Sequence, residues 1–141
     1  MKLHIAHSRA CASLAACMAA MLVLPSAAGA QTLQALSSGK TIHIEIHAMP
    51  QPAPLGQMLA PDLRLTDSSG KPLRVQSIAL TGLRIYTRNE LPTLPLVTAM
   101  PEPGHYRISG LRFHIAGQWR LTFAIKSETL EDKIDLQVLV K

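Results

Sequence analysis

The sequence predicts an all-β protein, an antiparallel β-sandwich of about seven short strands in a single domain. Apolar and polar residues alternate with a period of two in several short stretches, which is the period of a strand with one buried face. Proline and glycine separate these stretches, and none of them has the 3.6-residue period of an amphipathic helix. Short strands in this number, without helices, are typical of a sandwich.

The first 30 residues have the layout of a secretory signal peptide. Two basic residues, Lys2 and Arg9, come before an uncharged apolar run at 10–24, and small residues close the segment at Ala28 and Ala30. The apolar run is shorter than the ~20 residues that a membrane-spanning helix needs. The pattern therefore predicts export rather than a membrane anchor.

We expect cleavage before Gln31, so that residues 1–30 are a removed signal peptide and residues 31–141 form the exported domain. The predicted location is the periplasm, and no segment after the cleavage point has the length of a membrane span. Acylation at Cys17 is an alternative, because residues 14–16 before it are similar to a bacterial lipoprotein box.

The composition of residues 31–141 argues against several classes of function. Both cysteines, Cys11 and Cys17, lie in the leader, so the exported domain has no disulfide and no thiolate ligand. Removal of Lys2 and Arg9 leaves 12 basic residues against nine acidic ones, a net charge of +3. Because the basic residues are scattered and aromatic residues are few, we expect no binding of nucleic acid.

The first predicted strand covers residues 41–48. Its two faces differ sharply in polarity: one carries Ile42, Ile44 and Ile46, and the other carries His43, Glu45 and His47. Residues 49–61 follow with four prolines, which lack the N–H that a central strand must donate. We therefore predict a half-buried strand and then a long irregular connection.

The next predicted strand covers residues 62–66, with two leucines facing inward. Residues 67–72 have the composition of a turn, and we expect them to close a hairpin. Between 73 and 87 the apolar alternation changes phase near Ser77 and again at residues 81–82. This change predicts a bulge or a break between two strands.

Two aromatic residues mark the late strands. Glu102, Gly104 and Tyr106 have the spacing that opens a late strand in many sandwich domains, where the tyrosine hydroxyl caps a nearby backbone turn. Trp119 is the only tryptophan and begins a set of inward-facing residues. We predict that Tyr106 is a tyrosine corner and that Trp119 anchors the core.

The last third of the chain gives the clearest alternation. Residues 111–115 and 119–125 alternate on either side of a glycine-containing turn at 116–118, which predicts a hairpin. A polar turn at 127–133 leads to a final strand at 134–140.

Four places in the second half of the chain together match a known family pattern: Asp67 with Gly70-Lys71-Pro72, Leu91-Pro92-Thr93-Leu94-Pro95, Gly104-His105-Tyr106-Arg107-Ile108, and residues 110–119. On these residues the chain resembles the YtkA-like family of exported immunoglobulin-like domains, also described as FixH-like or auxin-binding-like. The resemblance covers roughly residues 62–125 and implies an immunoglobulin-like fold. Family members commonly carry methionine and histidine before the second place, where this chain has residues 86–90, and a methionine where it has Ile115. Most of the soft-metal ligands that the resemblance implies are therefore missing.

Five side chains are candidate ligands for copper or zinc: His43, Glu45, His47, His105 and His114. The first three share a strand face, but alternate strand residues lie ~6.6–6.8 Å apart, so one strand offers at most a neighbouring pair. A solvated strand face is the alternative reading of these three residues. Three methionines add thioethers suited to Cu(I): Met49, Met58 and Met100.

The sequence offers no nucleophile elbow, no thiol in the exported domain and no glycine-rich phosphate loop. We therefore expect a non-enzymatic binding or accessory module without a required cofactor. Its contact surface would be a sheet edge or the loops at 49–61 and 88–95, and its partner an exported or membrane protein of unknown identity. Copper or other transition-metal handling through surface histidines is the alternative.

Overall fold

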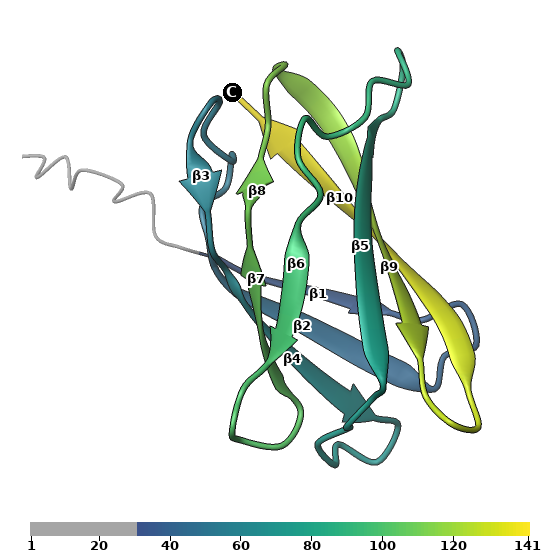
Figure 1. The fold of residues 1–141 in the computed structure, drawn as a ribbon. Coiled ribbons are helices and arrows are strands. Elements are labelled where there is room, and N and C mark those ends of the chain that lie inside the picture. Colours follow the sequence, from purple (N-terminus) through teal and green to yellow (C-terminus); the bar gives the residue numbers. More distant parts are fainter. Residues whose placement is uncertain (1–30) are drawn as a thin grey trace, which may run out of the picture.

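The computed structural model describes residues 31–141, which form ten strands (Figure 1). The strands are β1 (Gln31–Leu36), β2 (Ile42–Met49), β3 (Met58–Leu59), β4 (Asp62–Asp67), β5 (Ser77–Arg84), β6 (Leu96–Ala99), β7 (His105–Ser109), β8 (Leu111–Arg112), β9 (Gly117–Lys126) and β10 (Glu131–Val140). Within this part of the chain no helix could cross a membrane. The predicted signal peptide and the lipidation alternative at Cys17 lie outside the described residues.

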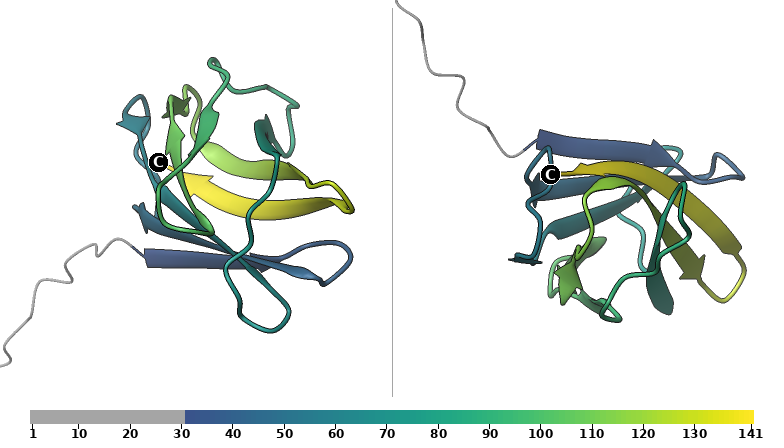
Figure 2. Two further views of the ribbon diagram at one scale, coloured as in Figure 1. Left: turned by 60° about the horizontal axis from the view of Figure 1, so that its bottom comes forward. Right: turned by 90° about the horizontal axis from the view of Figure 1, so that it is seen from above.

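All strand pairings within the sheets are antiparallel, which confirms the all-β prediction. A five-stranded sheet has the order β1-β2-β4-β7-β6, a three-stranded sheet has the order β10-β9-β5, and β3 pairs with β8. Figure 2 shows the two larger sheets curving around a common interior. The strand count exceeds the predicted seven because β1, β3 and β6 were not expected from the alternation. Of the strand predicted at 111–115, only the two residues of β8 form a strand.

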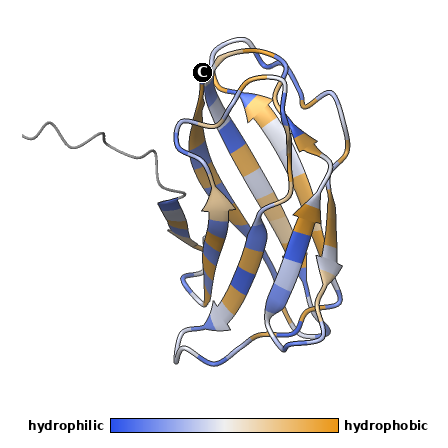
Figure 3. Ribbon diagram, turned by 90° about the vertical axis from the view of Figure 1, so that its left-hand side faces the viewer, coloured by the Kyte–Doolittle hydropathy of each residue, from blue (hydrophilic) through white to orange (hydrophobic). Residues whose placement is uncertain are grey.

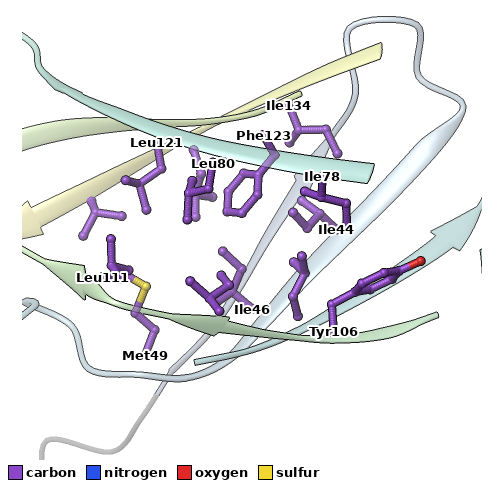
Figure 4. Packing of buried hydrophobic residues seen from close by; sticks show 14 of the residues in the cluster. Ile44, Ile46, Met49, Ile78, Leu80, Tyr106, Leu111, Leu121, Phe123 and Ile134 are labelled. Carbon is purple, nitrogen blue, oxygen red and sulfur yellow. The ribbon is translucent and has the colours of Figure 1, made fainter. Parts of the chain in front are cut away.

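The core lies between the two larger sheets, and alternation along each strand supplies it (Figures 3 and 4). On β2 the three isoleucines are buried and the residues between them are exposed or half-buried, as predicted. The same pattern on β9 and β10 buries Trp119, Leu121, Phe123, Ile125, Ile134, Leu136, Val138 and Val140. Burial of such side chains stabilises a fold by roughly 1.5–3 kcal/mol each.

The two hairpins predicted at the turns 67–72 and 116–118 do not form between the strands that flank these turns. After the turn at 67–72, one bridge between Thr66 and Pro72 continues the ladder, and the chain then crosses to pair β5 with β9. Residues 111–112 pair with β3, whereas β9 pairs with β5 and β10. Alternation determines which side chains of a strand are buried. The pattern does not depend on which strand lies alongside, so it cannot identify the partner strand.

The predicted break at residues 81–82 is also wrong, because β5 runs without interruption from Ser77 to Arg84. Gly82 occupies an inward position, and the side chain of Leu91 fills the space next to it, 2.7 Å from where a Cβ would lie. The alternation of β5 is therefore intact, although its inward residue at this place has no side chain of its own.

The hydroxyl of Tyr106 caps a backbone segment that is distant from it in sequence. Its hydroxyl donates to the carbonyl of Leu73 at 3.2 Å and accepts the N–H of Val75 at 3.0 Å. Residues 73–75 belong to the crossover from β4 to β5, so the tyrosine ties β7 to the connection between the two sheets.

Asp67 organises the turn that follows β4. Its carboxylate accepts hydrogen bonds from the hydroxyl and N–H of Ser69 and from the N–H of Lys71, at 2.6–3.0 Å. The bond from the Ser69 hydroxyl and then that from the Lys71 N–H hold the pKa of Asp67 below its usual value. The turn is therefore fixed locally, as its composition predicted.

Candidate functional site

The three predicted ligands on β2 lie on the outer face of the five-stranded sheet. Glu45 and His47 contact each other, with 3.4 Å between Oε2 and Nε2. The hydroxyl of Thr32 lies 3.2 Å from Nδ1 of His47. His43 stands at the other end of the strand, where its Cα partners are Leu36 and Thr66.

The other two predicted ligands are separated from each other. His105 begins β7, and its Nδ1 lies 3.4 Å from Oε2 of Glu102. His114 follows β8, with its ring edge-on to Trp119 and 5.8 Å between ring centroids. The two histidines therefore lie in different surroundings on the surface.

The structure places His47 and His105 on the same hollow. This hollow has a volume of about 520 Å³, and Asp62, Met100, Glu102 and Arg107 also line it. His43 lines a different hollow, together with Glu45. Of the three candidate methionines, Met100 lines the same hollow as the two histidines. Met58 is exposed on β3, and Met49 is buried in the core.

In the described part of the chain, no three His, Cys, Asp or Glu side chains are arranged closely enough to hold a metal ion. The hollow therefore brings two histidines and a thioether to one place without assembling a complete coordination shell. To bind a metal ion, the side chains that line the hollow would have to move closer together, because histidine nitrogen binds zinc at ~2.0–2.1 Å.

The rest of this outer face carries charges of alternating sign. Arg107 donates from Nε to Asp62 at 3.0 Å, on neighbouring strands, and Glu45 has Arg64 as its Cα partner. The side chains of the paired residues Arg107 and Asp62 are about half exposed. Such pairs contribute little to stability and are costly to strip of water, so this face is suited to solvent.

The outer face of the three-stranded sheet is different, and sequence reasoning missed it. Ala79 on β5 is the register partner of Ala124 on β9, and Thr81 is the partner of Thr122. Two hollows, of about 530 and 550 Å³, lie over these four small residues. We call the four the small-residue face. The available signal was that consecutive outward positions in the middle of β5 and near the end of β9 hold alanine and threonine.

Charged and apolar side chains surround the small-residue face. The charged residues are Glu90, Arg120, Lys126, Glu131, Asp132, Lys133 and Asp135. Some of these are paired: Lys126 lies 3.0 Å from Glu131, and Thr122 donates to Asp135 at 2.6 Å. Leu94 and Pro95 form part of the wall near β5.

Comparison with known proteins finds no match for this chain. No protein-family model, no curated protein and no solved structure matches it. The contrast between a charged outer face on one sheet and a face of small residues on the other is therefore the main guide to function.

Proposed function

We propose that the protein is a non-enzymatic exported binding module that acts by contact with another exported or membrane protein. The small-residue face is the contact surface in this proposal. The observation that carries it is the position of two adjacent hollows over Ala79, Thr81, Thr122 and Ala124, with charged side chains around them.

Physical chemistry favours this face over the other one. Protein interfaces have a core that is poor in charge and a polar rim, and the small-residue face has this distribution. Short side chains let a partner approach the sheet closely without displacing long mobile groups. Docking on the five-stranded sheet would instead remove water from the charged groups of Glu45, Asp62, Arg64 and Arg107.

We further propose that the fold is an immunoglobulin-like β-sandwich of the YtkA-like kind. Two features support this assignment: two antiparallel sheets enclose one core, and Trp119 is buried between the sheets. Such domains serve in many different functions, so the fold supports export and binding only in general terms.

A photo-crosslinking amino acid at Thr81 tests the contact surface in the cells that make the protein. We expect one predominant crosslinked partner protein, and a loss of at least about tenfold in its yield when Ala79→Arg is added. Thr98, exposed on β6 in the other sheet, is the matched control position and should give no such product. Equal crosslinking from Thr81 and Thr98 would contradict the proposal, as would a product that contains two copies of this chain.

Copper handling is the second candidate, and the hollow that His47, Met100 and His105 share favours it. Nitrogen and thioether ligands suit copper, and the carboxylates of Glu45 and Glu102 lie beside the two imidazoles and can orient them. In this proposal His43 and His114 take no part, because neither lines the hollow.

Titration of residues 31–141 with Cu(I), Cu(II) and zinc tests this second candidate. We expect one ion per chain and a loss of affinity of roughly 10- to 100-fold in both His47→Ala and His105→Ala. The matched controls His43→Ala and His114→Ala should bind as the parent protein does. Weak binding without defined stoichiometry, or an equal effect of all four replacements, would eliminate the copper proposal.

A further inference from the structure

We infer that one end of the molecule binds the surface of a membrane that contains anionic phospholipids. This end, the loop end, consists of residues 50–58, 85–90 and 112–118. Figure 1 shows the three segments at the same end as the C-terminus of the drawn chain. The N–H of Gly56 bonds the carbonyl of Phe113, and the N–H of Ile85 bonds that of Gln118, so the segments are joined to one another.

Three large apolar side chains extend from the loop end into solvent. Leu55 is 46% exposed, Met58 is 60% exposed and Tyr86 is 82% exposed. Tyrosine is well suited to the boundary between lipid and water because it has an apolar ring and a polar tip. Exposed apolar side chains at one end are unfavourable in water unless another surface covers them.

The backbone under these side chains is held in place. Leu55 donates its N–H to Lys141, and Met58 pairs with Arg112 on β8. Tyr86 lies in a turn closed by the bonds from Arg88 N–H to Arg84 and from Arg84 N–H to Asn89. Insertion of the three side chains would therefore order little additional backbone, which keeps its entropic cost low.

The charge of the loop end complements an anionic surface. Arg88 and Arg112 are exposed there, and Glu90 is the only carboxylate side chain in the three segments. The turns at the opposite end carry acid as well as base: Asp67 and Lys71 flank one turn, and Glu102 and Glu128 lie in two others. Each basic side chain close to an anionic leaflet contributes about 1 kcal/mol to binding, a factor of about five in affinity.

The shape of the loop end favours a bilayer over a protein partner. The hollows described above are lined by neither Leu55, Met58 nor Tyr86, so these side chains project from the surface. Projecting apolar groups with nearby arginines can enter the headgroup region without a complementary cavity. The small-residue face adjoins the loop end at Glu90, but its hollows are lined by none of Leu55, Met58, Tyr86 and Arg88, so membrane contact through these side chains does not rest on the proposed function.

Sedimentation with vesicles tests the inference. The sample is residues 31–141, because the apolar run at 10–24 would itself bind lipid, and this part contains every described strand and the whole described core. Vesicles of equal parts phosphatidylglycerol and phosphatidylcholine should sediment the protein, with affinity falling as salt rises. Vesicles of phosphatidylcholine alone should bind it at least about tenfold more weakly.

Two double variants separate the electrostatic and apolar contributions. Arg88→Gln with Arg112→Gln should weaken binding roughly 25-fold, from two basic contacts. Met58→Ser with Tyr86→Ser should weaken it at least about tenfold. The matched controls are Lys71→Gln with Arg74→Gln, and Leu36→Ser, which lie outside the loop end and should change binding less than about twofold.

Tyr86→Trp gives a readout that does not depend on loss of binding. Its emission should shift to the blue when anionic vesicles are added, whereas Trp119 is already buried and should not respond. Equal weakening by the control charge pair would show that attraction is not specific to the loop end and would overturn the inference. Failure of the parent protein to sediment with anionic vesicles would overturn the inference as well.

Discussion

Trp119→Ala is expected to destabilise the domain by about 3–5 kcal/mol, which is a large part of the stability of a domain this size. The side chain is fully buried on β9. Its ring packs edge-on against Phe113 with 5.4 Å between centroids, and its Nε1 donates to the carbonyl of Ile115 at 2.9 Å. Truncation removes the largest buried side chain, leaves a cavity and frees a carbonyl.

Equilibrium unfolding of residues 31–141 in urea measures this loss, and Trp119→Phe separates its causes. Phenylalanine retains most of the apolar contact but has no N–H for Ile115, so its cost should be smaller, about 1–3 kcal/mol. A loss below about 1.5 kcal/mol in Trp119→Ala would contradict the packing described. Such a small loss would mean that the connection at 113–116 keeps its place against β9 without the Trp119 ring.

The same tryptophan illustrates how much of the fold could be predicted from the sequence. Its burial, like that of the isoleucines of β2, follows from period-two alternation, because each strand must place its apolar face in the core. The partner of its strand could not be predicted in the same way. Phe113 and Trp119 are close in sequence and both buried, yet the chain crosses between sheets from β8 to β9 instead of forming the expected hairpin.

The candidate site shows the same limit. The alternation predicted that His47 lies on the outer face of its strand, but the hollow that it shares with His105 depends on β4 lying between β2 and β7. Nothing in the alternation specifies that order. The small-residue face was missed for another reason: alanine and threonine at outward positions carry no chemistry, and their meaning emerges only when Ala79 meets Ala124 across two strands.

Gly104→Ala is expected to destabilise the domain by about 2–5 kcal/mol, because a backbone cost and a steric cost add together. Gly104 has φ of +74°, where a side chain costs about 1–2 kcal/mol. A Cβ there would also lie 2.7 Å from the carbonyl oxygen of Leu65 and 2.9 Å from Cβ of Pro72. These atoms belong to backbone and ring, so they cannot swing away as the tip of a flexible side chain would, and overpacking of this kind adds ~1–3 kcal/mol.

Gly70→Ala is the matched control, because it isolates the backbone cost from the steric one. Gly70 has a similar φ of +83°, but nothing lies within 4 Å of the position of its Cβ. Its replacement should cost about 1–2 kcal/mol in the same urea experiment, less than the replacement of Gly104. Equal losses would refute the close approach of the 101–104 turn to β4. A larger loss at Gly104 would support a physical reason for the glycine before Tyr106: the turn must pass close to Leu65 and Pro72 before the tyrosine hydroxyl can reach residues 73–75.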